Sequence, residues 1–165
     1  MMRITTIMVG LGLLMSAACF AQSEDAVEAQ QLLLASDGLV RVKSALSVKD
    51  TANKLEAILK QKGMNVFARI DHGGAANQID VPLRPTELVI FGNPKVGSPL
   101  MACKQQVGID LPQKMLISES ANGDVWLTYN DPVYLFSRHN ISGCDTLLGK
   151  ITQALKNIAT AATHK

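Results

Sequence analysis

The sequence predicts an α+β fold, in which helices pack on one face of a mixed β-sheet within a single domain. Three observations support this prediction. Short apolar segments with strand periodicity alternate with amphipathic helices, of which the clearest are one early and one C-terminal helix. The chain has 165 residues, the length of one domain with a short leader. Neither an internal repeat nor a low-complexity stretch interrupts the sequence.

Residues 1–21 have the features of a cleaved secretory signal peptide. Arg3 provides the positive n-region, an uncharged apolar h-region follows, and small residues precede a cleavage site after Ala21. The apolar stretch is shorter than the roughly 20 residues of a membrane helix. We therefore expect a periplasmic or secreted protein. The alternative is a lipoprotein anchored through Cys19, although Ser16 stands where that signal prefers leucine.

The charge balance argues against a nucleic-acid partner. The formal net charge is +2 at pH 7, and loss of Arg3 with the signal peptide would lower it to about +1. A basic stripe that could neutralise phosphates is therefore not expected. Aromatic residues make up 4% of the chain, so platforms for stacking bases are also scarce. The mature sequence also offers no segment long and apolar enough to be transmembrane.

The first half of the mature chain divides into a lead and the start of the folded domain. Residues 22–38 are expected to form a flexible lead or a short helix, and residues 39–162 the α+β domain. Alternation of apolar and polar residues predicts a strand over 39–45. A helix over 47–62 follows, because Ser47 can cap it and apolar residues recur at helical spacing.

The middle of the chain predicts two further strands. The first covers residues 65–71, and the glycines of residues 72–74 then turn the chain. The second, residues 88–91, is short and fully apolar, which is typical of a strand in the centre of a sheet. A helix is expected within residues 94–106.

The last third predicts a hairpin and two helices. The hairpin joins residues 114–119 to residues 125–129 through Asn122-Gly123, which is a strong turn signal. Asp131-Pro132 then has the residue types of an N-cap and a first helical position. An amphipathic helix over 145–162 closes the domain.

Two cysteines, Cys103 and Cys144, remain after the predicted cleavage. Export would place them in an oxidising compartment, where exposed thiols tend to pair. A disulfide between them would close a loop of about 42 residues and contribute roughly 4 kcal/mol in the chain-entropy model. The alternative is two separate buried thiols that pack as small apolar groups.

Seven ordered segments of the sequence carry a family resemblance. They are Ala68-Arg69-Ile70-Asp71-His72, Leu83-Arg84-Pro85-Thr86-Glu87-Leu88, Phe91-Gly92-Asn93-Pro94-Lys95, Pro99-Leu100-Met101, Gly108-Ile109-Asp110-Leu111-Pro112, Tyr129-Asn130-Asp131-Pro132 and Arg138-His139. Together they resemble domain-of-unknown-function family 302, from about residue 39 to residue 162. The resemblance implies a compact α+β domain that often associates as a dimer. It implies no reaction, because none is assigned to the family.

The candidate catalytic residues are His72 and His139, with Asp71 as a carboxylate that could orient one imidazole. Histidine is the usual acid–base group near neutral pH. An enzyme of this kind requires the fold to bring these side chains into one shared cavity. The alternative for Asp71 is a turn cap, and the alternative for Arg138 is an ion pair with a carboxylate.

The candidate binding residues are polar and stand at the ends of predicted elements. They are Asn93, Lys95, Tyr129, Asn130, Asp131 and Arg138. We expect a small apolar or amphipathic ligand between the sheet and the helices, beside residues 93–95 and 129–131. A binding or protein-interaction module is therefore the leading hypothesis, the acid–base enzyme is the second, and a structural or stress-response homodimer without a ligand is the third.

The sequence favours neither a metal nor another cofactor. His72, His139, Asp71 and Cys144 could donate to a metal, yet no pair among them has the standard spacing. Residues 92–98 superficially resemble a phosphate-binding loop. They lack the Gly-Lys-Ser/Thr run of that loop, and Pro94 removes one of its amides.

Overall fold

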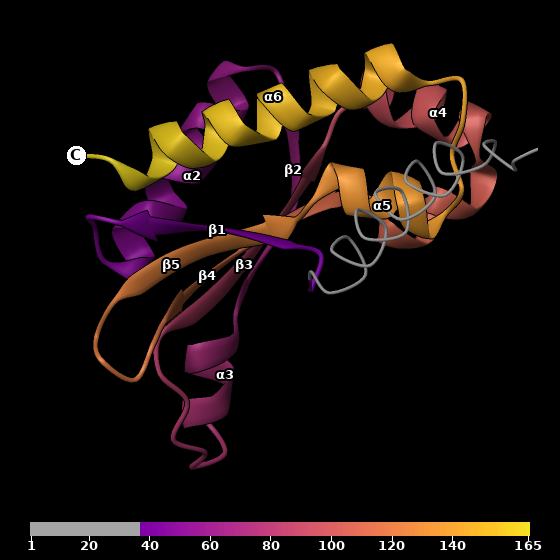
Figure 1. Cartoon of the computed structure of the whole chain (residues 1–165). Coiled ribbons are helices and arrows are strands. Elements are labelled where there is room, and N and C mark those ends of the chain that lie inside the picture. Colours follow the sequence, from indigo (N-terminus) through magenta and orange to yellow (C-terminus); the bar gives the residue numbers. More distant parts are fainter. Residues whose placement is uncertain (1–36) are drawn as a thin grey trace, which may run out of the picture. The chain divides into compact units, whose positions relative to one another are not determined.

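The computed structural model describes residues 37–165 (Figure 1). The predicted signal peptide, Cys19 and nearly all of the predicted lead lie outside the described residues. In chain order the elements are β1 (Leu39–Ser44), α2 (Val48–Gln61), β2 (Asn65–Asp71), α3 (His72–Asn77), β3 (Thr86–Gly92), α4 (Pro94–Cys103), the 3₁₀ helix η1 (Gln105–Asp110), β4 (Gln113–Glu119), β5 (Val125–Asn130), α5 (Pro132–Arg138) and α6 (Asp145–Thr163).

The five strands form one sheet in the order β1-β5-β4-β3-β2, and every neighbouring pair is antiparallel. The predicted α+β class is confirmed, but the sheet is antiparallel throughout and not mixed as expected. The reason is the path of the first crossover, which connects the two edge strands. Helix α2 carries the chain from β1 to β2, which run in the same direction but occupy opposite edges of the sheet. The meander β2-β3-β4-β5 fills the space between them, so no two parallel strands become neighbours.

Helices α2 and α6 pack against each other and against one face of the sheet (Figure 1). Each helix buries one apolar stripe in the hydrophobic core. The strands contribute every second residue to this core, because successive strand side chains point to opposite faces of the sheet. The cross-strand neighbours Val89, Met115 and Tyr129 show this alternation across β3, β4 and β5. The largest fully buried side chains are Phe91, Leu55, Leu59, Met115, Ile117, Leu127 and Ile158.

The predicted elements agree with the observed ones apart from local differences, one of which is the 3₁₀ helix η1, which was not predicted. Residues 72–74 begin the short helix α3 and do not form a simple turn, because the Asp71 side chain accepts a hydrogen bond from the Gly74 amide at 2.7 Å and caps the helix. The interior strand β3, which lies between β4 and β2, covers residues 86–92 and is therefore longer than its apolar part. Within residues 37–165, no helix is both long and apolar enough to cross a membrane.

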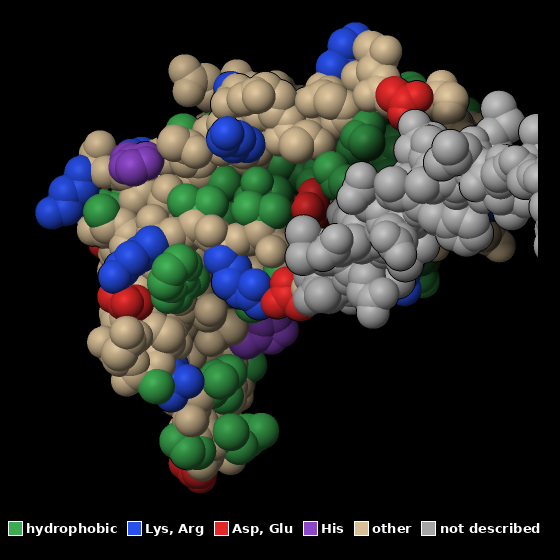
Figure 2. Space-filling view, viewed as in Figure 1, with side chains coloured by type: hydrophobic (Ala, Val, Ile, Leu, Met, Phe, Trp, Pro, Cys, Tyr) green, Lys and Arg blue, Asp and Glu red, His purple; other side chains and the backbone are tan. Residues whose placement is uncertain are grey.

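The strand directions place α4 and α5 at the same end of the sheet. Strand β3 leads into α4 and β5 leads into α5, and these two strands run in the same direction. The N-terminal part of α6 extends over this end as well (Figure 1). Figure 2 shows the surface in the same view, with exposed hydrophobic side chains on α3 and on the loop that follows it, at the other end of the sheet.

Candidate functional site

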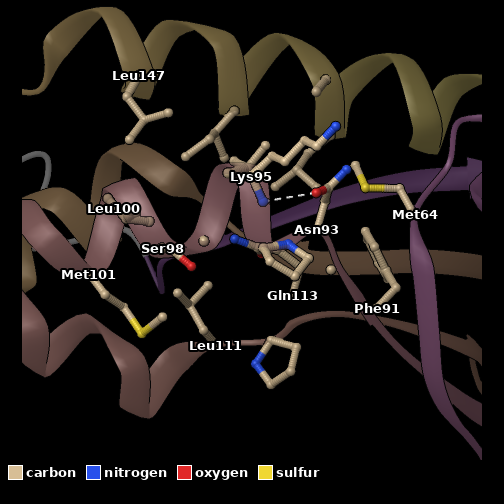
Figure 3. A pocket seen from close by; sticks show the side chains of 18 of the residues that line it. Met64, Phe91, Asn93, Lys95, Ser98, Leu100, Met101, Leu111, Gln113 and Leu147 are labelled. Carbon is tan, nitrogen blue, oxygen red and sulfur yellow. Dashed lines mark hydrogen bonds between the residues drawn. The ribbon is translucent and has the colours of Figure 1, made fainter.

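An apolar pocket of about 680 Å³ lies between α4, η1, the end of β3 and the N-terminal half of α6 (Figure 3). Most of its lining side chains are hydrocarbon or thioether groups. The lining residues are Met64, Phe67, Phe91, Gly92, Asn93, Pro94, Lys95, Val96, Gly97, Ser98, Leu100, Met101, Gly108, Leu111, Pro112, Gln113, Leu147, Lys150, Ile151, Ala154 and Leu155. Figure 3 shows side chains of α4 and α6 facing each other across this space.

The floor and the rim of the pocket differ in exposure. Phe91, Leu100 and Leu155 form part of the floor and are 1%, 4% and 3% exposed, because they also belong to the hydrophobic core. Phe67 and Met101 lie at the rim and are 56% and 37% exposed. The pocket is therefore a continuation of the core that opens to the surface.

Asn93 determines where α4 begins and thereby places Lys95 at the pocket. The Asn93 side-chain oxygen accepts a hydrogen bond from the Lys95 amide at 2.9 Å, and its amide group donates to the Gly63 carbonyl at 3.5 Å. Pro94 occupies the first helical position, where its missing N–H is not needed. This cap leaves the Lys95 ammonium free of the capping contacts.

Gly92 allows two side chains to approach the floor of the pocket. A Cβ atom at this position would lie 3.3 Å from the Phe67 ring and 3.7 Å from Pro112 Cβ. The first distance is tighter than ordinary van der Waals contact, so a larger residue would push the Phe67 ring away. The glycine in the Phe91-Gly92-Asn93 segment therefore contributes to the shape of the pocket.

The wall formed by η1 is anchored by a carboxylate that the sequence analysis did not single out. Asp110 Oδ2 lies 2.5 Å from His139 Nε2, and Asp110 Oδ1 lies 3.4 Å from Arg138 Nη1. The side chains of His139 and Asp110 are 9% and 13% exposed, so water screens this pair only weakly. The Lys114 ammonium donates to the Asp110 and Pro112 carbonyls at 3.0 Å. These contacts hold η1 against α5 and β4.

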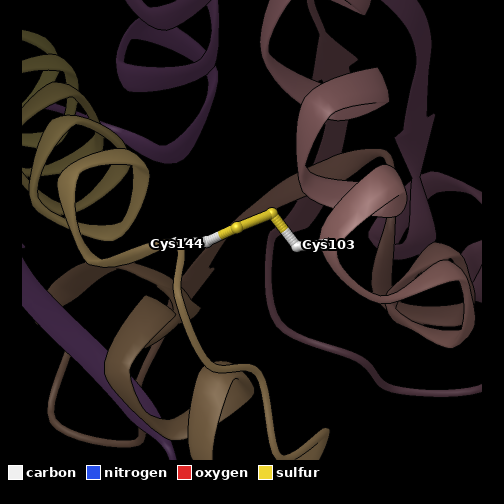
Figure 4. The surroundings of a disulfide bond; sticks show 2 residues. All are labelled: Cys103 and Cys144. Carbon is white, nitrogen blue, oxygen red and sulfur yellow. A yellow bond between two sulfur atoms is a disulfide. The ribbon is translucent and has the colours of Figure 1, made fainter.

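Cys103 and Cys144 form a pair at disulfide distance, with Cα atoms 6.6 Å apart (Figure 4). Cys103 ends α4, and Cys144 immediately precedes α6. Because α4 and α6 are opposite walls of the pocket, the pair links the two walls at one end. The expected pairing of these cysteines is thus in agreement with their positions.

The structure does not bring the two candidate catalytic histidines together. His72 follows β2, and His139 ends α5, which follows β5. Strands β2 and β5 run in opposite directions and are separated by β3 and β4, so their ends lie at opposite ends of the sheet and about 14 Å apart across it. Asp71 caps α3, and His72 is exposed. The predicted cluster of Asp71, His72 and His139 does not form.

The second expected binding segment, residues 129–131, lies outside the pocket lining. Tyr129 faces the core and is 5% exposed; burial raises the pKa of its phenol, and the charge of Asp131 adds to this effect. Asp131 caps α5 by accepting a hydrogen bond from the Val133 amide at 2.9 Å. Asn130 ends β5 and lies opposite Leu39 of the edge strand β1. Asn93 and Lys95 are thus the two predicted binding residues that line the pocket.

A separate charged cluster ties α2 to the sheet. Arg69 Nε lies 2.6 Å from Glu87 Oε2, and Arg69 Nη1 lies 2.7 Å from the Asn53 side-chain oxygen. The hydrogen bond with Glu87 raises the pKa of Arg69, and Glu56 adds to this effect. The hydrogen bond with Lys60 is the largest cause of the lowered pKa of Glu56. This cluster is part of the fold and does not face the pocket.

Among residues 37–165, histidine, cysteine and acidic side chains do not gather in groups of three that could hold a metal ion. The polar groups of the pocket are amides, one serine hydroxyl and two ammonium groups. This set can hydrogen-bond to or attract a ligand. The pocket is therefore suited to binding.

Comparison with known proteins gives a family and a fold. A family model described as "Domain of unknown function DUF302" matches residues 40–158. The crystal structure of an uncharacterized conserved DUF302 protein from Bacillus stearothermophilus superposes with a TM-score of 0.69 and 19% identity, covering 77% of this chain and 99% of that one. This likeness shows the shared fold.

Two curated relatives are named fluoride-specific ion channels. The chain is 49% identical over 104 residues to "Fluoride-specific ion channel FluC 1" of Brucella suis biovar 1 (strain 1330), a match that covers 63% of this chain and 41% of that protein. The same identity over the same length is found with the protein of that name from Brucella abortus biovar 1 (strain 9-941), of which 38% is covered. The chain thus spans about two fifths of the length of these relatives.

Proposed function

The chain belongs to the DUF302 family, and we propose that it is a binding module for a small apolar or amphipathic molecule, which it holds in the pocket between α4 and α6. The observation that carries this proposal is the convergence of three sequence segments on one cavity. Residues 91–95, 99–101 and 108–112 carry the family resemblance, and each contributes side chains to the pocket lining. Segments that only specified turns would not need to share a cavity.

The size and the surface of the pocket support this proposal. Sites for small molecules usually have volumes of about 300–1,000 Å³ and are lined mainly by apolar side chains with a few polar groups. The pocket has about 680 Å³ and fits this description. Burial of each ligand methylene contributes about 0.8 kcal/mol, and association costs offset part of this gain. A dissociation constant on the order of micromolar is therefore expected for a compact apolar ligand.

The test is a titration of the full chain with the neutral fluorescent probe N-phenyl-1-naphthylamine, whose emission rises in apolar surroundings. Ala154 lines the pocket on α6, so Ala154→Phe is expected to fill part of the space and weaken probe binding at least fivefold, or about 1 kcal/mol. Ala161 lies on the same helix but is exposed, so Ala161→Phe is the matched control. No rise in emission with the unmodified chain, or equal affinities for the two variants, would contradict the proposal.

A second candidate function is association into a homodimer through the segment after α3. Ile79, Val81 and Leu83 lie on this segment and are 71%, 47% and 43% exposed, which is unusual for three large apolar side chains so close in sequence. Burial of these side chains against a second copy would remove them from water. Light scattering coupled to size exclusion would report the mass, and replacement of all three by serine is expected to yield the monomer if this segment is the interface. A monomer before substitution would exclude it.

The proposed place of action is outside the cytoplasm. The Cys103–Cys144 pair supports this location, because disulfides persist in oxidising compartments. Residues 1–21 would act as the export signal. N-terminal sequencing of the protein from the periplasmic fraction would give Gln22 as the first residue after ordinary cleavage, and a lipid-modified Cys19 for the lipoprotein alternative. An intact Met1 in a cytoplasmic fraction would contradict export.

A further inference from the structure

The charged groups that line the pocket all have the same sign. Lys95 comes from the first turn of α4, and Lys150 comes from α6. Among the residues that the structure describes, no aspartate or glutamate lines the pocket. Within the part of the chain that the structure describes, neither ammonium group takes part in an ion pair, and both side chains are exposed. The pocket thus combines an apolar interior with a positively charged rim.

The backbone adds to this positive character. Helix α4 begins at Pro94, beside the pocket, so the positive end of its dipole faces the same rim. The floor has the opposite character, since Phe91, Leu100 and Leu155 are buried hydrocarbon. The two charged side chains are thus exposed, whereas the buried floor of the pocket is hydrocarbon.

We propose that the ligand is a single-chain amphiphile with an anionic headgroup of the fatty-acid class, whose carboxylate lies between Lys95 and Lys150 while its alkyl chain extends over the apolar floor. This inference rests on the proposed function and adds the ligand class to it. An unpaired cation at a rim attracts an anion, and the low dielectric of the adjacent apolar floor strengthens that attraction. The free energy gained by burying the ligand's alkyl chain does not depend on the headgroup.

Because the headgroup and the alkyl chain contribute separately to binding, the proposal can be tested with amphiphiles that share one alkyl chain and differ in headgroup. Dodecanoic acid, 1-dodecanol and dodecyltrimethylammonium have the same alkyl length and differ in headgroup charge. Each would displace N-phenyl-1-naphthylamine from the full chain at pH 8, where a carboxylate is ionised, and at concentrations below micelle formation. Because the rim is exposed, two lysine contacts are expected to favour the acid over the alcohol about three- to tenfold, and added salt is expected to reduce this preference.

The lysines are tested by the double substitution Lys95→Gln and Lys150→Gln. The ratio of the affinities for dodecanoic acid and 1-dodecanol is expected to fall to about one. Lys49→Gln is the matched control, because Lys49 is exposed in the first turn of α2, about 20 Å along that helix from the end near Met64. Thermal unfolding of each variant confirms that it is folded.

The outcomes separate the two proposals. Displacement by none of the three amphiphiles, together with the absence of probe binding, would overturn the proposed function and this inference with it. Equal displacement by all three, or a preference for the cationic or the neutral head, would overturn the anionic headgroup alone. A preference for the acid that survives the double lysine substitution would also overturn it, because the charge would then be recognised elsewhere.

Discussion

Replacement of both Cys103 and Cys144 by serine is expected to lower the free energy of unfolding by about 4 kcal/mol. The two cysteines are 41 residues apart in sequence, and the chain-entropy model for a loop of this length gives about 13 cal/mol/K, or about 4 kcal/mol at 25 °C. For a domain of this size such a loss corresponds to a decrease in the melting temperature of about 15 °C.

The structure adds a second consequence. The pair links the end of α4 to the start of α6, and these helices form opposite walls of the pocket. Without the link, the walls are held together by packing alone, so N-phenyl-1-naphthylamine is expected to bind more weakly to the double serine variant than to the oxidised chain. This result would connect the redox state of the pair with the binding site.

The assay is thermal and urea unfolding followed by circular dichroism, with probe titration on the same samples. The oxidised chain treated with a reductant is the control, because it retains both sulfur atoms and loses only the bond. The free energy of unfolding of the reduced chain is expected to match that of the double serine variant within about 1 kcal/mol, since both cysteines are half-buried. A loss below about 1 kcal/mol in both samples would refute the reasoning, because it would mean that no loop is closed in the unfolded chain.

Substitutions at His139, Arg69 and Tyr129 test two polar side-chain pairs and the buried phenol. His139→Ala removes the closer of the two side-chain partners of the poorly exposed Asp110 and is expected to cost about 1–3 kcal/mol. His72→Ala, at an exposed position, is expected to change stability by less than about 0.5 kcal/mol; equal losses in urea unfolding would contradict the role of the His139–Asp110 contact. Arg69→Ala leaves Glu87 unpaired and is expected to cost about 1–3 kcal/mol, with Arg69→Lys costing less; identical unfolding midpoints for the two variants would argue against it. Burial raises the pKa of Tyr129 above its ordinary value, so the neutral phenol contributes stability that is present below about pH 10 and is lost as the pH rises toward the folded-state pKa. Unfolding free energies measured between pH 8 and pH 11 are therefore expected to fall more steeply for the unmodified chain than for Tyr129→Phe, and parallel curves would show that the phenol does not contribute.

Local sequence patterns were sufficient to predict most of the helices and strands. Helix α2 could be predicted from the Ser47 cap and one apolar stripe, and the β4–β5 hairpin from Asn122-Gly123 between alternating segments. Each of these signals depends on a few neighbouring residues, so it can be recognised in the sequence before the fold is known. The seven family segments likewise depend only on sequence order, and the family that they indicated is confirmed.

Strand neighbours and the pocket depend on contacts between distant residues. A helical crossover suggests parallel strands, but only the tertiary structure shows that β1 and β2 occupy opposite edges. His139 and Asp110 are 29 residues apart, and no local period connects them. Asn93 and Lys95 could be singled out as binding residues because they start a helix. Lys150, one of two lysines on α6, was not singled out, because only the packing of α6 beside α4 places it at the pocket.

The sequence by itself thus determined the fold class, the order of the elements, the family and the two cysteines available for pairing, because periodicity, caps and turns are properties of neighbouring residues. The tertiary structure decided which element ends meet. It separated His72 from His139, brought Cys103 to Cys144, and placed Lys95 and Lys150 around one apolar cavity. A site assembled from residues as far apart in sequence as Lys95 and Lys150 exists only once the core has packed, since the same burial that stabilises the fold also positions the walls of the pocket.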